Sequence, residues 1–462
     1  MKPIPILVFL LIILNGFILG EETLSFGRFG PVTLYQNSPQ PGRMVLFISG
    51  DGGWNLGVVD MARAIAGEDA LVAGIDITRY LKQLEKSTED CSYPAADFES
   101  LSKFVQKEKK FSDYQTPILI GYSSGATLAY ALLVQAPPNT FAGAISLGFC
   151  PDLPLTKPLC RGGGLEWGPG PKGKGYSFLP ARNLPVPWIA FQGIVDQVCS
   201  AESTAAYVRQ VKNGEIVMLE KVGHGFSVQK NWLPQFRDAF RKITARSQPV
   251  SSPVTAEIGD LPLIEARPER WQADCFALII TGDGGWASID RSLGNALAAR
   301  GVGVVGLNSL KYFWKARTPE SSARDLERIV RHYLAAWKKE KVILIGYSLG
   351  ADVLPFMANR LPSDIQSRIS LIALIGPSRR TEFEFHLSEW LGMSSEKKSL
   401  PVLPEVEKLR GKKILCFCGS KESDSLCLML DSSLAKTICM PGGHHLGGDY
   451  ESLAASIIDE AR

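Results

Sequence analysis

The sequence has little excess charge of either sign and few histidines. Its 50 Lys and Arg residues nearly balance 47 Asp and Glu residues, which leaves a net charge of +3. Proteins that bind nucleic acid carry a clear excess of basic residues, so no nucleic-acid partner is expected. No Cys and His spacing typical of a metal site occurs, and no cofactor motif. Only five of the 462 residues are His. A His that recurs in a sequence pattern is therefore a stronger candidate for a catalytic residue.

Long apolar runs are absent after the first 20 residues. The run "IPILVFLLIILNGFILG" follows Met1 and Lys2 and precedes an acidic pair. A short positive start followed by roughly 15 apolar residues is typical of a secretory signal peptide, here residues 1–20, with an uncleaved anchor as the alternative. No later run reaches the roughly 18–20 apolar residues that a membrane span needs. We therefore expect an exported, periplasmic and largely soluble protein.

Nine cysteines also favour export, because disulfides are rare in the cytosol. Cys150 and Cys160 bracket a proline-rich loop, and Cys427 and Cys439 are a second candidate pair, although connectivity cannot be deduced from sequence. The odd count leaves at least one free thiol or an intermolecular bond. The "CFC" triplet at 416–418 alternates across a predicted strand, so we expect these cysteines in the core.

Five short patterns occur twice, in the same order along the chain. The heptad "ISGDGGW" at 48–54 returns as "ITGDGGW" at 280–286. The other pairs are "LVAGIDITRYL" with "VGVVGLNSLKYF", "LIGYSSGATL" with "LIGYSLGADV", "DQVC" with "DSLC", and "GHGF" with "GHHL". A repeat unit of roughly 200 residues is too long for a solenoid and indicates a domain duplication.

The repeats divide the chain into two domains. We expect a first domain at 21–246, a Ser- and Pro-rich linker at 247–262 and a second domain at 263–462. In each unit short apolar stretches such as "FALIITG" and "KVILIGYS" alternate with helical stretches. This alternation indicates a mainly parallel sheet covered on both faces. The predicted fold is two tandem α/β-hydrolase-like domains, each built on a doubly wound sheet.

Each unit contains G-Y-S-x-G between an apolar strand and a helix, with Ser123 and Ser348 at the centre. This is the nucleophile-elbow pattern of α/β-hydrolases. The flanking glycines permit a sharp turn that raises the Ser hydroxyl above the sheet and directs the N–H groups of the next helix at developing negative charge. We predict a nucleophile in each unit; an ordinary strand–helix turn is the alternative.

A nucleophile elbow requires an acid and then a His further along the chain. His224 and His444 occupy matched positions in "GHGF" and "GHHL", so they are the predicted bases. Asp196 is the predicted acid of the first unit. In the second unit the D-x-x-C match favours Asp424, while Glu422 is the alternative because it follows a Gly by three residues, as Asp196 does. The Ser would attack, the His would take its proton and the acid would hold the imidazolium.

The repeated heptad follows an early strand, where α/β-hydrolases take their second oxyanion N–H. We predict that the backbone N–H groups of Asp283 and Leu349 form the oxyanion hole of the second unit, with Asp51 and Ser124 as counterparts. A phosphate-binding glycine loop is the alternative. It is disfavoured because no G-K-[ST] follows and the G-x-G-x-x-G spacing is absent.

A family resemblance rests on four motifs that span most of residues 275–455. They are "GDGGWASID", "SLKYFWKARTPE", "GYSLGADVLPF" and "PGGHHLGGDY". With them the second unit resembles the bacterial VirJ domain, and the two-unit layout resembles the VirJ/AcvB virulence protein family. The first unit departs from the pattern, since "ITRYLKQLEKST" replaces "SLKYFWKARTPE". The resemblance implies a periplasmic α/β-hydrolase that removes the aminoacyl group, typically lysyl, from aminoacylated phosphatidylglycerol at the membrane surface. It also implies links to virulence and type IV secretion.

Such a substrate fits the predicted chemistry, because an aminoacyl ester is activated towards a Ser nucleophile. Asp352, one turn into the elbow helix, is a candidate for binding the lysyl ammonium, with helix packing as the alternative. Lys311, Lys315 and Arg317 would approach the lipid phosphate or form a solvated charge cluster. We expect the activity in the second unit, which keeps the fuller family pattern.

Two other functions compete with this one. A non-catalytic adaptor on a hydrolase scaffold would bind envelope or secretion-system proteins. The intact Ser, acid and His in both units argue against it. A general carboxylesterase or lipase is the other alternative.

Overall fold

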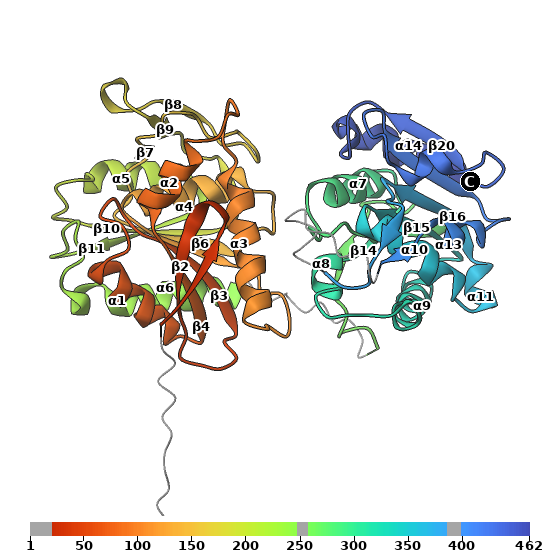
Figure 1. Ribbon diagram of the computed structural model, residues 1–462, viewed down its shortest axis with the longest axis horizontal. Coiled ribbons are helices and arrows are strands. Elements are labelled where there is room, and N and C mark those ends of the chain that lie inside the picture. The colour runs from red at the N-terminus through yellow and green to blue at the C-terminus, as the bar shows by residue number, and fades with distance from the viewer. Residues whose placement is uncertain (1–20, 247–256, 386–398) are drawn as a thin grey trace, which may run out of the picture.

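The computed structural model describes residues 21–246, 257–385 and 399–462, which form two lobes (Figure 1). The predicted signal peptide and most of the predicted linker lie outside these ranges. The exact domain boundaries therefore stay a prediction. Within the described ranges, no helix combines the length and the apolar character needed to cross a bilayer.

The first lobe is built on an eight-stranded sheet with the order β1-β2-β4-β3-β5-β6-β10-β11. The first two pairings are antiparallel and the others are parallel. The strands are β1 (Glu22–Phe26), β2 (Gly30–Tyr35), β3 (Arg43–Ile48), β4 (Ala70–Ile75), β5 (Ile118–Tyr122), β6 (Gly143–Leu147), β10 (Asn183–Gly193) and β11 (Lys212–Leu219).

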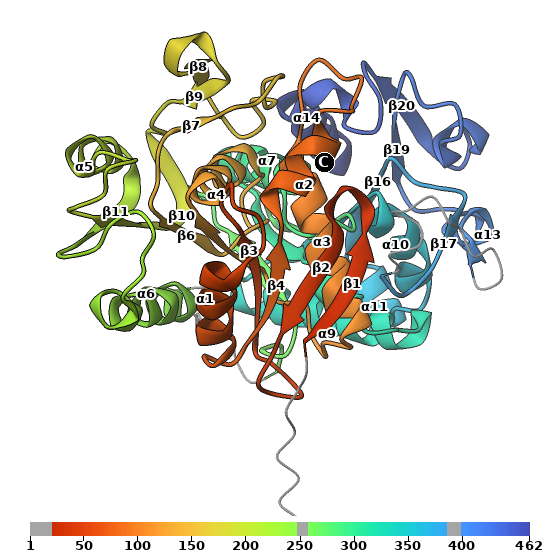
Figure 2. The same cartoon turned by 60° about the vertical axis from the view of Figure 1, so that its left-hand side comes forward.

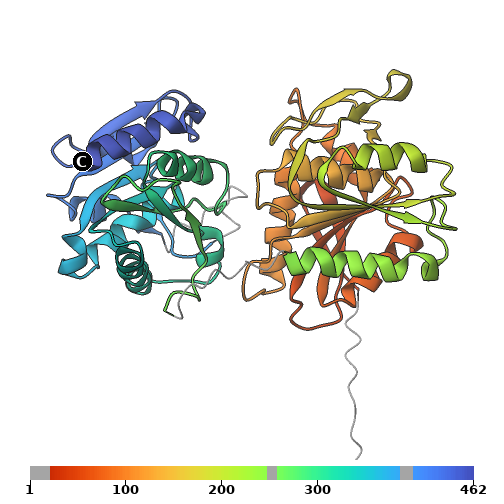
Figure 3. The ribbon, with the colours of Figure 1, turned by 180° about the vertical axis from the view of Figure 1, so that it is seen from behind.

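Helices cover both faces of this sheet. Side chains of β3 alternate between two cores: Leu46 and Ile48 pack with α2, α3, α4 and α5, whereas Val45 and Phe47 pack with α1 and α6. Helix α6 is the long green helix in Figure 3. The bounds are α1 (Leu56–Ala66), α2 (Ile77–Leu84), α3 (Pro94–Glu108), α4 (Ser124–Gln135), α5 (Ala201–Val208) and α6 (Leu233–Arg246).

The second lobe repeats the arrangement with seven strands in the order β12-β14-β13-β15-β16-β19-β20, of which only β12 is antiparallel to its neighbour. These strands follow the order of β2 to β11, so the predicted duplication of a doubly wound, mainly parallel sheet is confirmed. The strands are β12 (Leu263–Ala266), β13 (Cys275–Ile280), β14 (Gly303–Leu307), β15 (Lys341–Tyr347), β16 (Ile369–Ile375), β19 (Ile414–Gly419) and β20 (Lys436–Met440).

The helices of the second lobe also lie in two layers. Helices α7 and α14 share one core, and α9, α10 and α13 share the other. The bounds are α7 (Ser288–Ala299), α8 (Ser309–Tyr312), α9 (Pro319–Ala336), α10 (Leu349–Asn359), α11 (Ser363–Gln366), α13 (Leu403–Glu407) and α14 (Tyr450–Ala461).

The lobes differ most in the connection that follows β6 and β16. In the first lobe it forms a three-stranded sheet of β7 (Asp152–Leu153), β8 (Trp167–Pro169) and β9 (Tyr176–Phe178), which stands beyond the main sheet in yellow in Figure 2. The disulfide Cys91–Cys160 ties it to the chain before α3. Among its described residues, the corresponding connection of the second lobe contains β17 (Arg380–Thr381) paired with β18 (Leu400–Pro401).

The disulfides do not join the cysteines that the sequence suggested as pairs. Neither Cys150–Cys160 nor Cys427–Cys439 forms. The fold brings other cysteines together, with Cα atoms 4.5–5.5 Å apart in the four observed bonds. Cys439, for example, is paired with Cys418 on the adjacent strand β19. The "CFC" cysteines are buried, as expected, and both are disulfide-bonded. Cys275 is free. The bonds are Cys91–Cys160, Cys150–Cys199, Cys416–Cys427 and Cys418–Cys439.

Candidate active site

Ser123 and Ser348 lie in the tight turns that join β5 to α4 and β15 to α10. Their φ angles are 54° and 50°, a region that residues with a side chain rarely adopt. A Cβ atom on Gly121 would lie 2.0 Å from the carbonyl oxygen of Gly125, and the equivalent contact in the second lobe would be 2.4 Å. Only glycine fits there, so both turns have the backbone geometry of a nucleophile elbow.

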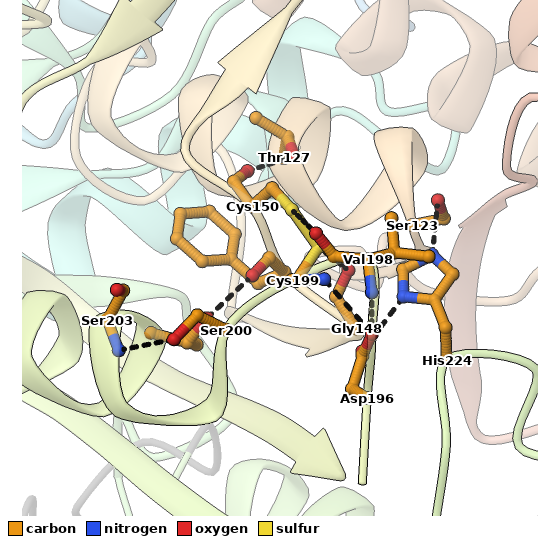
Figure 4. The surroundings of a disulfide bond; sticks show 12 residues. Ser123, Thr127, Gly148, Cys150, Asp196, Val198, Cys199, Ser200, Ser203 and His224 are labelled. Atoms are coloured by element: carbon orange, nitrogen blue, oxygen red, sulfur yellow. Dashed lines mark hydrogen bonds and ion pairs between the residues drawn. A yellow bond between two sulfur atoms is a disulfide. The ribbon is translucent and has the colours of Figure 1, made fainter. Parts of the chain in front are cut away.

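Hydrogen bonds connect Ser123, His224 and Asp196 in an unbroken chain (Figure 4). Nε2 of His224 lies 3.0 Å from Oγ of Ser123, and Nδ1 lies 2.9 Å from Oδ2 of Asp196. The Ser comes from the elbow, the acid from the loop after β10 and the His from the loop after β11. The structure therefore brings together the three residues that the sequence predicts, with the His able to accept the Ser proton.

The Asp196 carboxylate is held by more than the His. Its Oδ1 accepts the backbone N–H groups of Val198 at 2.8 Å and Cys199 at 3.0 Å, and its Oδ2 accepts an N–H of Gln192 at 3.0 Å. Burial raises the pKa of Asp196, but the hydrogen bonds from Cys199, His224 and Val198 outweigh it and hold this pKa below the ordinary value. The carboxylate thus stabilises the fold above the unfolded pKa of about 4, and this contribution is lost as pH falls through the folded pKa.

The disulfide Cys150–Cys199 fastens this acid loop (Figure 4). Cys199 donates its N–H to Asp196, and the carbonyl of Cys150 accepts the hydroxyl of Thr127 from the elbow helix α4. The bond therefore links the acid loop to the chain segment beside the elbow. Asp196, Cys199 and His224 place three ligand-type atoms within 4.8 Å of one another, but the Cys sulfur is in the disulfide, so this donor set does not suit a metal ion.

Removal of this disulfide by the double change Cys150→Ala and Cys199→Ala is expected to slow the first site. In a Ser348→Ala background, fluorophosphonate labelling of Ser123 should fall on the order of tenfold, because Asp196 loses a fixed N–H donor. Thermal unfolding should show a stability loss of about 2–4 kcal/mol. The matched control is the Cys91→Ala, Cys160→Ala protein, which should lose stability but keep the labelling rate. Equal slowing in both proteins would contradict the assignment.

His444 occupies the place in the second lobe that His224 occupies in the first. A Cβ atom on Gly376, just after β16, would lie 2.8 Å from Cε1 of His444, and one on Gly148, just after β6, would lie 3.2 Å from Cε1 of His224. Nδ1 of His444 lies 2.7 Å from Oε1 of a carboxylate. Within the described residues no hydrogen bond joins His444 to Ser348. The second site therefore lacks the His–Ser hydrogen bond that the first site has between His224 and Ser123.

The carboxylate on His444 belongs to Glu422, so the choice of Asp424 is wrong. Glu422 follows Gly419 at the end of β19 by three residues, just as Asp196 follows Gly193 at the end of β10. Its Oε2 also accepts the N–H of Gly419 at 2.7 Å, which fixes the carboxylate. The distance from the end of the strand determines which acid reaches the His ring, and the D-x-x-C match was misleading for that reason.

The glycine heptads form turns directly beside the elbows. A Cβ atom on Gly50 would lie 3.0 Å from Cβ of Ser123, and one on Gly282 would lie 3.5 Å from Cβ of Ser348. Each heptad is closed by a backbone hydrogen bond, of 2.9 Å in the first lobe and 3.0 Å in the second. The heptads therefore bring backbone N–H groups close to both nucleophiles.

The predicted oxyanion donors lie on either side of each nucleophile. Ser124 and Leu349 are the first residues of α4 and α10, and neither helix has a side-chain hydrogen bond at its N-cap. Asp51 and Asp283 follow the glycines that touch the nucleophiles. In the first lobe the Ser124 hydroxyl also donates to Asp51 at 2.6 Å. This arrangement suits an oxyanion hole, and the assignment of its four N–H groups stays a prediction.

Comparison with known proteins settles the family. The model of the VirJ family, described as a bacterial virulence protein, matches residues 42–142 and 274–462, which is more than half of the chain. The chain belongs to the VirJ family. The second matched segment contains Ser348, Glu422 and His444 of the VirJ-like second lobe, whereas the first ends before Asp196 and His224.

Several solved structures also resemble this VirJ-family chain at low identity. The esterase domain of a Rhodothermus marinus protein is 17% identical, with 49% of this chain and 98% of that one covered and a TM-score of 0.33. XC6422 from Xanthomonas campestris, an α/β serine hydrolase without a lid, is 17% identical, with coverage of 50% and 96% and a TM-score of 0.32. A putative dienelactone hydrolase from Klebsiella pneumoniae is 14% identical, with coverage of 49% and 97% and a TM-score of 0.34. A search of curated proteins gave no significant match.

Asp352 of the VirJ-like lobe is buried and hydrogen-bonded within the protein. It is 5% exposed, and its carboxylate accepts the N–H of Ser378 at 2.6 Å. Thr127, its counterpart, contacts the carbonyl of Cys150 in the matching segment of the first lobe. Both side chains join the elbow helix to the segment after the adjacent strand, which supports helix packing. The ammonium-binding role of Asp352 therefore stays a prediction.

The predicted phosphate-binding cations have different surroundings. The Arg317 guanidinium lies 4.6 Å from the ring centre of Tyr312 and 3.9 Å from a carboxylate oxygen of Asp325. Lys315 forms an ion pair of 3.0 Å with Asp113 of the first lobe. Lys311 is surface-exposed, although partial desolvation lowers its pKa. In the described ranges Lys311 alone of the three lacks a side-chain partner.

Two polar residues near the sites were not predicted from the sequence. Gln192 is fully buried in β10 and binds Asp196, but nothing distinguishes it from other strand residues. Asp290 is 3% exposed in α7, and its Oδ1 has no hydrogen-bond partner among the described residues. Desolvation raises the pKa of Asp290 well above the ordinary value. In the repeat the matching residue is Val58, so only the alignment of the two units could have pointed to Asp290.

Proposed function

We propose that this VirJ-family protein is a serine hydrolase that cleaves carboxylic esters at two Ser–His–acid sites. The observation that supports this most is the hydrogen-bonded chain of Ser123, His224 and Asp196. Oγ of Ser123 attacks the ester carbonyl while Nε2 of His224 takes the hydroxyl proton. The proton then passes to the departing alcohol oxygen. Water, deprotonated by the same His, cleaves the acyl-enzyme and releases the acid.

The proposed substrate is the aminoacyl ester of aminoacylated phosphatidylglycerol, with the lysyl form as the first to test. The motifs of the VirJ family favour the second lobe for this reaction, with Ser348 as nucleophile and His444 and Glu422 as base and acid. An α-ammonium group activates the neighbouring ester carbonyl, which suits a Ser nucleophile. Lys311 is the cation that we assign to the lipid phosphate, because its ammonium has no side-chain partner within the described residues.

We also infer that the protein acts in the periplasm. Its four disulfides require an oxidising compartment, and the periplasm is one in bacteria. The first 20 residues, which the sequence predicts to be a signal peptide, would direct it there. The membrane lipid would then be met at the periplasmic surface of the inner membrane.

This function is tested by measuring the lysine that the protein releases from vesicles that contain lysyl-phosphatidylglycerol. The parent protein should release lysine, Ser348→Ala should lose most of the activity, and the protein with Ser123→Ala and Ser348→Ala should release none. Full activity in Ser348→Ala would show that the reaction takes place at the first site.

Fluorophosphonate labelling separates the competing functions. If the parent releases no lysine but both serines are labelled, the protein is an esterase for another substrate. If neither serine is labelled, the hydrolase proposal is wrong and an adaptor for envelope or secretion-system proteins is favoured.

A further inference from the structure

Two segments that border the second active site are covered by the first lobe. One is residues 309–317, which begins with α8 and which we call the α8 segment. The other is the end of the second glycine heptad at Trp286. Helix α3 and the loop after it face the α8 segment across the boundary between the lobes (Figure 1). The contacts between the lobes therefore fall on the active-site side of the second sheet.

Trp314 is the centre of the first contact. Its ring is 3% exposed and lies 5.2 Å from the ring centre of Tyr114 in the first lobe and 5.7 Å from that of Phe385. Together with Leu310 these rings form a separate apolar cluster. The indole N–H donates to the carbonyl of Phe111 at 2.8 Å. A buried aromatic with a satisfied polar group is typical of the anchor of an interface.

Charged groups add to the same contact. The ammonium of Lys107 on α3 donates to the carbonyl of Trp314 at 2.8 Å and lies 4.6 Å from the centre of its ring. Lys315 pairs with Asp113 at 3.0 Å. Both the backbone and the side chains of the α8 segment are thus held by the first lobe.

The second contact reaches the predicted oxyanion loop. Asn139, in the loop after α4, donates from Nδ2 to the carbonyl of Trp286 at 3.1 Å. Trp286 is 5% exposed and ends the heptad that touches Ser348 through Gly282. Asn139 itself has a φ of 73°, a conformation in which Asn and Gly are favoured. A side chain of the first lobe therefore binds the backbone at the end of the heptad whose Gly282 lies beside the second nucleophile.

The duplication provides an internal comparison for the α8 segment. Trp314 matches Lys82 in the first lobe, where α2 follows β4 as α8 follows β14. Asp76 and Asn308 cap these two helices in the same way. Lys82 is exposed to solvent, whereas Trp314 is buried. A large apolar residue at this position is suited only to a unit whose surface is covered, so the two segments have diverged according to what covers them.

We propose that the first lobe positions the second active site by docking on the α8 segment and on the heptad turn. Trp314 and Asn139 are the positioning residues, and neither touches the reacting atoms. This proposal rests on the proposed function of Ser348. It gives the first lobe a role that does not depend on its own Ser123.

The test uses the full chain in a Ser123→Ala background. Trp314→Lys introduces the residue that the first lobe has at this position, and Asn139→Gly removes the amide without straining the positive φ. Backbone hydrogen exchange in residues 282–287 and 309–317 should become about tenfold faster in Trp314→Lys, and in residues 282–287 in Asn139→Gly. The rate of fluorophosphonate labelling at Ser348 should fall in both, by several-fold or more.

Control variants separate positioning from general destabilisation. Trp271→Lys changes a tryptophan of the second lobe that is 41% exposed and contacts Trp337, so it should alter neither readout. Trp314→Phe should recover part of the labelling rate. If Trp314→Lys does not fold, Asn139→Gly still tests the idea, because it leaves the second lobe unchanged. Unchanged exchange and labelling in a folded variant would overturn the proposal. A parent that is never labelled at Ser348 would instead refute the proposed function, while the exchange data would still report on docking.

Discussion

In a Ser348→Ala background, His224→Ala is expected to lower kcat for a water-soluble ester by at least about ten-thousand-fold. Nε2 of His224 lies 3.0 Å from the Ser123 hydroxyl, and without it no group in the hydrogen-bonded chain accepts the proton. Loss of the base of a triad costs about as much as loss of the whole triad, since the three groups act as a unit. Steady-state hydrolysis of a nitrophenyl ester measures the effect.

His332→Ala is the matched control for this experiment. His332 lies on α9 of the second lobe and contacts Tyr333, so its removal should leave kcat of the first site unchanged. Retention of more than a few per cent of the activity in His224→Ala would show that the observed chain of hydrogen bonds is not the catalytic machinery.

In a Ser123→Ala background, Glu422→Gln is expected to lower kcat of the second site by about ten-thousand-fold. The amide cannot hold an imidazolium, and it can favour the wrong tautomer of His444, which is the known effect of an acid-to-amide change in a triad. The bond from Nδ1 of His444 to Oε1 of Glu422 is 2.7 Å long. The measurement is kcat on the same ester at fixed pH.

Asp424→Asn is the decisive comparison for that variant. The structure places a backbone contact at Asp424, whose carbonyl accepts an N–H of Arg379 at 3.2 Å, and this contact survives the change. Activity within about threefold of the parent is therefore expected, which corresponds to about 0.7 kcal/mol. The opposite pattern, in which Asp424→Asn is the inactive variant, would restore the choice made from the D-x-x-C match.

The class of sheet could be predicted from the sequence, because alternating apolar strands and helices indicate a mainly parallel sheet covered on both faces. The order of the strands was not predicted. The elbows could be predicted as well, since the glycines next to Ser123 and Ser348 are required by contacts inside one turn. The matched histidines followed from the repeat. These features share one property: the information lies within a few residues, or in the comparison of the two units.

Features that depend on neighbours in space were not predictable. The acid that reaches His444 depends on how far its loop extends from β19, and the sequence match at Asp424 says nothing about that distance. The burial of Asp352 depends on the segment after β16, and the pairing of Cys150 with Cys199 depends on β6 and β10 being adjacent. The small sheet of β7, β8 and β9 arises from a glycine-rich insertion with no periodicity.

The disulfides of the two acid loops are not equivalent. Cys199 in the first acid loop is bonded to Cys150, which corresponds to Ser378 of the second lobe. Cys427, at the end of the second acid loop, is bonded to Cys416, which corresponds to Ala190 of the first lobe. Neither bond therefore has a counterpart in the other lobe. Each lobe thus holds its acid loop with a covalent bond that the other lobe lacks.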